Sequence, residues 1–217
     1  MIITIDGTSG VGKGTLAQKL AQELNYPYLD SGVIYRASAC YALENNLDPA
    51  TSSDEDLKKL LKSLKLSFQS NKIYIDTKDV TDLIRTEVIS QNASIIASKS
   101  ILRDLFLKMQ RDFGLTGNLI TDGRDMGTVV FPKAQLKIFL IASSAVRANR
   151  RFLQLKSKGQ NPNYNQILKD IEERDLRDST REVAPLIPAN DAIIIDSSDM
   201  NAIQVLEKVK KLILDQN

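Results

Sequence analysis

The chain has 217 residues, 29 basic and 27 acidic side chains, a net charge of +2, one cysteine and no histidine. The missing histidine excludes Ser-His-Asp and Cys-His catalysis and imidazole metal ligands. The near-balanced charge gives no case for a nucleic-acid surface, the apolar runs are too short to span a membrane, and a lone Cys40 suits a reducing cytosol. We therefore expect one cytoplasmic domain that carries insertions and has no membrane or nucleic-acid partner.

Short β-branched runs alternate with segments of helical spacing along most of the chain. Strands are predicted at 2–5, 28–29, 119–121, 136–141 and 192–195. Helices are predicted after the first strand from Leu16 to Leu24 and at about 32–45, 54–63, 100–113, 144–157, 164–180 and 201–214. This alternation favours an α/β fold, in which helices cover both faces of a parallel sheet.

One segment departs from that rhythm. Apolar and polar residues alternate from Leu64 to Ile75 around a Ser70-Asn71 turn, which predicts a hairpin with one solvated face. We therefore expect a single unit over 1–217, with a core of about 1–63 and 98–217 and a small insertion at about 64–97. A polar loop at about 155–165 is the other irregular segment.

A glycine cluster lies between the first predicted strand and its helix. It consists of Gly7, Thr8, Ser9, Gly10, Val11, Gly12, Lys13, Gly14 and Thr15. Glycines let successive backbone N–H groups converge on one anion, the helix N-terminus adds positive charge, and Lys13 can reach the outer phosphates. The cluster therefore predicts a phosphate-binding loop. The usual pattern has Ser or Thr directly after the lysine; here Gly14 is in that place, and Thr15 is the candidate Mg²⁺ ligand.

Charged clusters follow other predicted strands and helices. They are Asp30-Ser31 with Tyr35-Arg36, Asp122-Gly123-Arg124-Asp125, Arg174 to Asp178 with Arg181, and Arg147 with Arg150 and Arg151. The first two clusters follow predicted strands, whose carboxyl ends should open onto one crevice. Arg174, Asp178 and Arg181 share one helical face that suits phosphate or sugar contacts, and a solvated salt-bridged face is the alternative. Arg147 and Arg151 could close over a transferring phosphate as a lid or form a solvent-facing helix edge.

Taken together, these motifs resemble the bacterial cytidylate (CMP) kinases. The resemblance runs in order through Gly10–Thr15, Leu29–Ala37, Asp122–Pro132, Arg174–Asp178 and Arg181–Leu186. It implies the P-loop nucleoside monophosphate kinase fold, a five-stranded parallel sheet flanked by helices. That fold carries a β-containing nucleotide-binding insertion, matched here by the odd hairpin, and a short lid.

The resemblance also implies roles for individual residues. Arg36, Arg124 and Arg181 would hold the CMP phosphate; Ser94, Arg103 and Asp125 would contact the cytosine; Arg174 and Asp178 would contact the ribose; and Asp30, Ser31 and Tyr35 would line the same pocket. The expected catalytic set is Lys13, Arg124, Arg147, Arg151 and Arg181.

The implied reaction is the transfer of the γ-phosphoryl group from MgATP to CMP, with dCMP as a second acceptor. We expect a monomer whose partners are these small nucleotides. The alternatives are the same reaction on UMP or AMP, or a non-catalytic nucleotide-binding regulator. A regulator should have a phosphate loop without a second, arginine-rich anion site.

Overall fold

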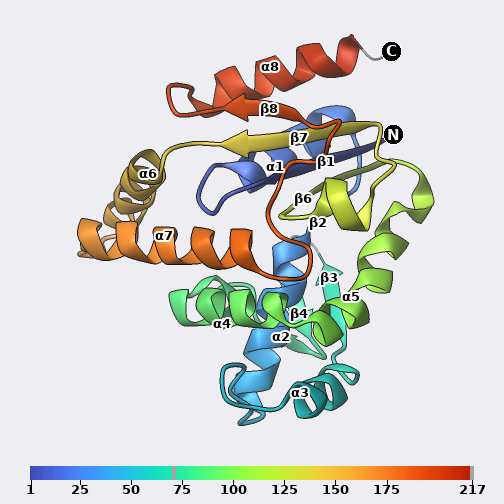
Figure 1. Cartoon of the computed structure of the whole chain (residues 1–217), viewed down its shortest axis with the longest axis vertical. Coiled ribbons are helices and arrows are strands. Elements are labelled where there is room, and N and C mark those ends of the chain that lie inside the picture. The colour runs from blue at the N-terminus through green and yellow to red at the C-terminus, as the bar shows by residue number, and fades with distance from the viewer. Residues whose placement is uncertain (70–71, 216–217) are drawn as a thin grey trace. The chain divides into compact units, whose positions relative to one another are not determined.

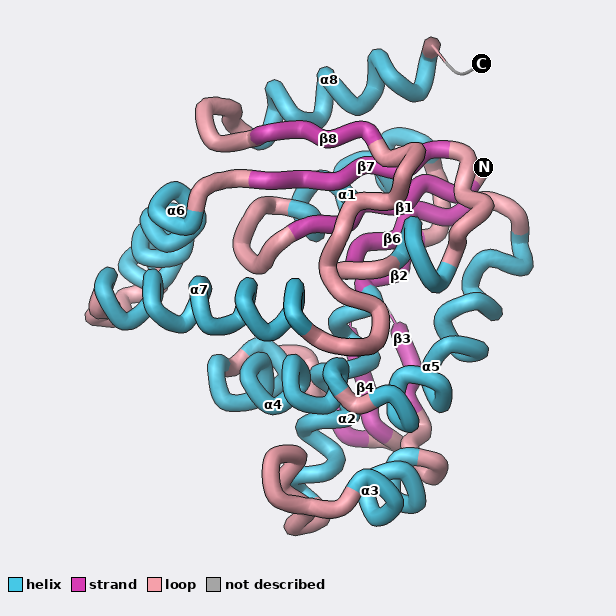
Figure 2. Tube along the Cα trace, in the orientation of Figure 1, coloured by secondary structure: helices cyan, strands magenta, loops and turns pink. Residues whose placement is uncertain are grey.

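The computed structural model describes residues 1–69 and 72–215. Within them, the apolar runs form a five-stranded parallel sheet in the order β2-β6-β1-β7-β8 (Figures 1 and 2). The strands are β1 (Ile2–Gly7), β2 (Tyr28–Asp30), β6 (Leu119–Gly123), β7 (Leu136–Ile141) and β8 (Ile193–Asp196). This confirms the α/β fold with a parallel sheet, and each predicted strand matches an observed one.

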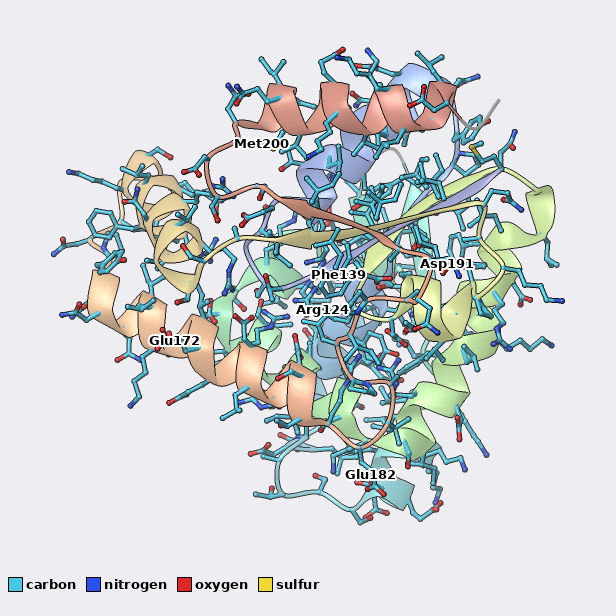
Figure 3. The ribbon with its side chains drawn as sticks, turned by 45° about the horizontal axis from the view of Figure 1, so that its top comes forward. Arg124, Phe139, Glu172, Glu182, Asp191 and Met200 are labelled. Carbon is cyan, nitrogen blue, oxygen red and sulfur yellow. The ribbon has the colours of Figure 1, made fainter. Side chains whose placement is uncertain are left out.

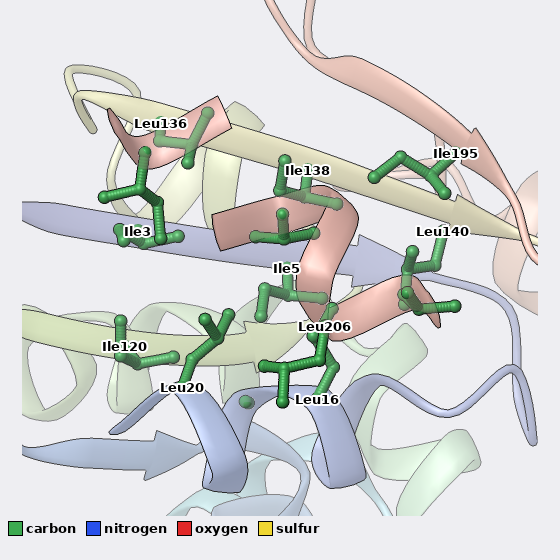
Figure 4. Close-up of a cluster of buried hydrophobic side chains, with 14 of the residues drawn as sticks. Ile3, Ile5, Leu16, Leu20, Ile120, Leu136, Ile138, Leu140, Ile195 and Leu206 are labelled. Atoms are coloured by element: carbon green, nitrogen blue, oxygen red, sulfur yellow. The ribbon is translucent and has the colours of Figure 1, made fainter. Parts of the chain in front are cut away.

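Alternation along β1 gives the sheet two different faces. Ile3 and Ile5 are fully buried and join an apolar cluster with α1 (Lys13–Leu24) and α8 (Ala202–Leu214), which cover that face (Figure 4). The residues between them, Thr4 and Asp6, point to the opposite face because successive strand side chains alternate. On β1, the strand that leads into the glycine cluster, the face opposite the apolar cluster therefore carries polar side chains. We call it the polar face.

Helices and one irregular turn complete this part of the chain. A π-helical turn, η3 (Met126–Val130), follows β6, and α6 (Ser144–Ser157) and α7 (Tyr164–Thr180) pack against each other. Both of these helices have the bounds expected from their apolar spacing. A short 3-10 helix, η2 (Phe113–Thr116), precedes β6.

The chain divides into two compact units, and the segment Asp30–Asp112 forms the second. It contains α2 (Ser31–Glu44), α3 (Asp54–Leu61), η1 (Leu83–Arg85), α4 (Glu87–Ser98) and α5 (Ser100–Asp112). It also contains an antiparallel sheet that, among the described residues, has three strands: β3 (Leu66–Gln69), β4 (Lys72–Ile75) and β5 (Lys78–Asp79). α2 packs against α4, and α3 against α5.

The hairpin predicted from the alternation at 64–75 is present. Leu66 pairs with Ile75 and Gln69 with Lys72, while the predicted Ser70-Asn71 turn lies outside the described residues. Ile73 and Ile75 are buried as expected, but Phe68 is 44% exposed. The short third strand and helix α4 were not expected. The proposed insertion at about 64–97 lies within the second unit, and its role stays a prediction.

In residues 1–69 and 72–215, no helix combines the length and the apolar character needed to cross a bilayer.

Gly7, at the end of β1, has no room for a side chain. Its φ is +146°, and an added Cβ would lie 2.1 Å from the carbonyl oxygen of Leu140 on β7. We expect Gly7→Ala to lower the free energy of unfolding by about 3 kcal/mol or more, measured by denaturant titration. Gly14→Ala is the matched control: its Cβ would lie 3.6 Å from the Tyr28 hydroxyl, an ordinary contact. Equal stability of the two variants would contradict this prediction.

Candidate active site

The glycine cluster forms the connection between β1 and α1. Gly12 is the N-cap of α1 with a φ of 104°, and it provides no capping side chain for the first-turn amides. Lys13 opens the helix, and its Nζ donates a hydrogen bond to the carbonyl oxygen of Thr8, 2.7 Å away. A helix N-terminus preceded by such a loop is suited to binding phosphate.

Lys13 is buried, but its surroundings are charged rather than apolar. The residue is 6% exposed. Burial, followed by repulsion from Arg124, holds the pKa of its ammonium well below the ordinary value; Arg174 acts in the same direction, and Asp122 and Asp178 oppose it. The glycine loop and the arginines that follow β6 and lie on α7 therefore share one electrostatic environment. Because Lys13, Arg124 and Arg174 repel one another there, a bound phosphate would be favoured.

Arg124, labelled in Figure 3, follows the buried strand β6. Its guanidinium pairs with a carboxylate of α7. Its Nε donates to Asp178 Oδ2 at 2.8 Å, and its Nη1 donates to the carbonyl oxygen of Gly123. Burial opposes ionisation of Asp178, but Arg124, Arg174 and Arg181 together hold the pKa of its carboxyl below the ordinary value. The structure thus brings Arg124 and Asp178 together as a partly buried ion pair, although 54 residues separate them in the chain.

Arg181 and Asp125 form a second pair in the same unit. Nη2 of Arg181 lies 3.7 Å from Oδ1 of Asp125, and both side chains are almost fully buried. The Nε of Arg181, at the C-terminal cap of α7, also donates to the carbonyl oxygen of Ala184. Each predicted phosphate-binding arginine of this unit is therefore held by a carboxylate that the resemblance assigns to the nucleoside.

Arg147, a candidate lid residue, is tied down in the structure. It lies on the first turn of α6, and its guanidinium donates to the carbonyl oxygens of Ala142 and Ser9 and to Asp175 Oδ2. It thereby joins the glycine loop to α7. Arg151, one turn later, is partly exposed and donates to Gln154 instead. The two arginines are thus held differently, and their catalytic roles stay predictions.

We expect Arg147→Ala to lower the free energy of unfolding by about 2–4 kcal/mol, because it leaves the Asp175 carboxylate and two carbonyl oxygens without this donor. Arg151→Ala removes the same charge from the same helix at a more exposed position and should change stability by less than about 1 kcal/mol. Denaturant unfolding of both variants measures the difference. Similar values for the two would show that the Arg147 contacts contribute little to stability.

The other residues predicted to bind the acceptor belong to the second unit. Asp30 caps α2 by accepting from the backbone N–H of Val33, and its Oδ2 accepts from Arg36 Nη2 at 2.8 Å. Ser31, the first residue of α2, is buried. Arg36 is therefore also held by a carboxylate, in the same manner as Arg124 and Arg181.

A cation–π contact joins two more of the predicted acceptor residues. The guanidinium carbon of Arg103, on α5, lies 5.7 Å from the ring centroid of Tyr35 on α2. Phe106 packs edge-to-face on the same ring at 5.6 Å, and Arg103 Nη1 donates to the carbonyl oxygen of Ala97. Ser94, on the unexpected helix α4, is 4% exposed. It is therefore not an exposed helical serine, which was the alternative to a role in binding cytosine.

One charged residue of the polar face is absent from the predicted set. Asp6 is buried at the end of β1 and accepts hydrogen bonds from the backbone N–H groups of Met126 and Gly127. Burial raises the pKa of its carboxyl to about 6. A signal was available in the sequence: a carboxylate directly follows the run Ile2 to Ile5 and precedes the glycine cluster.

Known proteins with similar sequences point to one family. A family model described as cytidylate kinase matches residues 3–215. Cytidylate kinase 1 of Haemophilus influenzae is 48% identical over 212 residues, which cover 96% of this chain and 91% of that protein. A cytidylate kinase of Yersinia enterocolitica is 47% identical over 211 residues, covering 95% and 91%.

Among solved structures, an uncharacterized protein from Eubacterium ventriosum aligns over 99% of this chain and 98% of that one, with a TM-score of 0.52 and 14% identity. At that identity, the similarity concerns the fold alone.

Proposed function

The chain belongs to the cytidylate kinase family, and from this premise we propose that it transfers the γ-phosphoryl group of ATP to CMP, and also to dCMP. One observation in the structure supports this most strongly. Lys13 of the glycine loop lies within electrostatic reach of Arg124, Arg174 and Asp178, which are the residues predicted to bind the acceptor nucleotide. A donor-phosphate site and an acceptor site in one environment are what phosphoryl transfer requires.

On the donor side, backbone N–H groups of Gly7–Thr15 would surround the outer phosphates of ATP. Lys13 would exchange the carbonyl oxygen of Thr8 for a phosphate oxygen and neutralise charge that develops on the transferring group. Negative charge from these phosphates would also stabilise the ammonium, whose pKa is lowered in their absence.

On the acceptor side, Arg124 and Arg181 would hold the CMP phosphate, with Arg36 contributing from the second unit. Guanidinium groups suit this task because they bind phosphate oxygens in a bidentate manner. The carboxylates that now pair with Arg124 and Arg181 keep these groups ordered without substrate. We propose that all three arginines meet in one pocket around this phosphate.

The acceptor oxygen needs no general base, because a phosphate monoester is ionised near neutral pH. A chain with no histidine can therefore carry out the reaction by positioning and charge neutralisation. Transfer to CMP must also exclude water. We assign this task to the segment at about 155–165, which contains the connection between α6 and α7, and to the insertion at about 64–97.

Magnesium is the metal that kinases of this kind use with ATP, and the donor set near Lys13 suits it. Asp122 is a buried carboxylate whose charge acts on Lys13, and its Oδ1 accepts from the Tyr28 hydroxyl at 2.6 Å. Mg²⁺ keeps several waters and usually binds one or two protein carboxylates together with substrate phosphates. Asp122 would therefore be sufficient as its protein ligand. When bound, the ion neutralises charge on the β- and γ-phosphates. Thr15 is exposed on the first turn of α1 and stays a candidate ligand.

A coupled assay of ADP release tests the proposal, with MgATP and CMP, dCMP, UMP or AMP as acceptor. We expect fast turnover with CMP and dCMP, slower turnover with UMP, and little with AMP. Preference for UMP or AMP would assign the chain to the same chemistry on another base. Nucleotide binding without acceptor-dependent ADP release would instead indicate a regulator. The cytidylate kinase relatives favour neither alternative.

The expected partners are the nucleotides themselves, and we propose that the enzyme acts as a cytoplasmic monomer. The single cysteine is buried and, like the near-balanced charge, is compatible with that setting. Sedimentation of the purified chain with and without nucleotides tests the oligomeric state.

A further inference from the structure

Asp6 connects two segments that lie far apart in the sequence. Its Oδ1 accepts from the backbone N–H of Met126 at 2.9 Å, and its Oδ2 accepts from that of Gly127 at 2.7 Å. Asp6 is 5% exposed, so neither bond competes strongly with water. The end of β1 therefore holds the start of η3 through both oxygens of one carboxylate.

The two amides follow Asp125 directly, and Asp125 is the residue predicted to contact cytosine. Asp125 has φ −146° and ψ 22°, outside regular helix and strand geometry. Its carbonyl oxygen accepts from the backbone N–H groups of Val129 and Val130 within the same turn. Because Asp6 holds the next two amides, it fixes the peptide planes that determine where the Asp125 side chain points.

Close packing holds the same turn from a second direction. An added Cβ on Gly127 would lie 2.9 Å from Thr4 Oγ1 and 3.2 Å from Cδ of Lys137. The turn therefore lies directly against β1 and β7. A change at Asp6 cannot be absorbed by moving the turn further in, so the turn must move outward or rotate.

We propose that Asp6 is a positioning residue that fixes Asp125 and thereby contributes to the choice of cytosine over uracil. This inference rests on the proposed function and on the predicted cytosine contact of Asp125. A carboxylate accepts from the cytosine amine and faces the uracil carbonyl unfavourably, so this discrimination depends on where the Asp125 carboxylate lies.

The inference can be tested with an isosteric substitution. Asp6→Asn keeps one acceptor oxygen and places an amide N–H₂ against the second backbone N–H, so one of the two bonds is lost. The measured quantity is kcat/KM for CMP divided by kcat/KM for UMP, at saturating MgATP. We expect this ratio to fall by about tenfold or more.

Thr4→Val is the matched control. Thr4 lies two residues earlier on the same face of β1, is fully buried, and its hydroxyl has no hydrogen-bond partner among the described residues. Valine has the shape of threonine, so this substitution removes a buried hydroxyl but keeps the packing of residue 4 against Gly127 and both Asp6 bonds, and the ratio should stay at the wild-type value. Binding of MgATP to both variants, together with thermal unfolding, confirms that they are folded.

The pH dependence of the wild-type ratio gives a second readout that does not require a variant to fold. Burial raises the pKa of Asp6 to about 6; Asp125 acts in the same direction, and Lys13 and the two backbone amides oppose it. Lys137, the cation on β7 beside the turn, is bonded to the carbonyl oxygen of Pro132 and to Asp191. Below the pKa the carboxyl is protonated and one oxygen becomes a donor, so it loses an acceptor for the turn.

The ratio should therefore be constant above about pH 7 and fall below about pH 6, while the Asp6→Asn ratio should stay low throughout. Ionisation of the acceptor phosphate cancels in the ratio, because CMP and UMP carry the same group. A folded Asp6→Asn protein with the wild-type ratio, or a wild-type ratio independent of pH, would overturn the inference. Absence of wild-type activity on CMP would refute the proposed function instead.

Discussion

Lys13→Ala is expected to lower kcat by about 10²–10³-fold or more and to leave the fold intact. Lys13 opens the helix that follows the glycine loop, so its ammonium is expected to reach the outer phosphates, and its Nζ now bonds the loop carbonyl of Thr8. Burial and neighbouring arginines lower its pKa, so holding this charge without phosphate is unfavourable. Its removal should therefore cost little stability. Steady-state kinetics and circular dichroism measure the two effects.

Lys19→Ala is the control for this experiment, because it removes a lysine from the same helix beyond the glycine loop. Its kcat should stay within about twofold of wild type. If Lys13→Ala retains most of its activity, the glycine loop does not act through this ammonium. If it loses its native circular dichroism, Lys13 serves the fold rather than the site.

Arg181→Ala is expected to weaken CMP binding by at least about 30-fold while changing MgATP binding by less than about threefold. Arg181 is fixed by the carbonyl oxygen of Ala184 and faces Asp125, so its guanidinium is held in place before the substrate arrives. Its loss removes a phosphate contact and leaves the buried Asp125 carboxylate without this counter-charge. Isothermal titration with each nucleotide measures both affinities.

Lys169→Ala is the matched control for Arg181. Lys169 lies on α7 as well, but it is exposed and paired with Glu173 on the helix surface. Its removal changes the net charge by the same amount and should leave both affinities unchanged. Equal weakening of CMP and MgATP binding in Arg181→Ala would place Arg181 in the donor site or in the scaffold.

The strands and helices of the parallel-sheet unit could largely be predicted from the local pattern of apolar residues in the sequence. The apolar run 136–141 and the spacing over 144–157 and 164–180 are long and regular, and the observed bounds of β7, α6 and α7 agree with them. Helix α4 was missed because β-branched pairs such as Val88-Ile89 and Ile95-Ile96 interrupt a helical reading of its sequence. Packing against α2 and α5 compensates for that weak local preference.

The contacts of the site could not be predicted from local pattern. The Arg124–Asp178 and Arg147–Asp175 pairs connect residues whose proximity depends on the whole fold. The conformation of η3 depends on Asp6, 120 residues earlier than Met126. Residue types and spacing identified the candidate arginines, but the partner that holds each of them is a property of the tertiary structure.

The central claim is that the glycine loop binds the donor phosphates of ATP while the predicted acceptor arginines bind the phosphate of CMP, so that the two nucleotides can react. A bisubstrate nucleotide, with adenosine and cytidine joined through a polyphosphate bridge, tests this directly by titration calorimetry. We expect it to bind at least about 100-fold more tightly than ATP or CMP alone, and to lose affinity in both Lys13→Ala and Arg181→Ala. Affinity no better than that of ATP, or affinity sensitive to only one of the two substitutions, would contradict the claim.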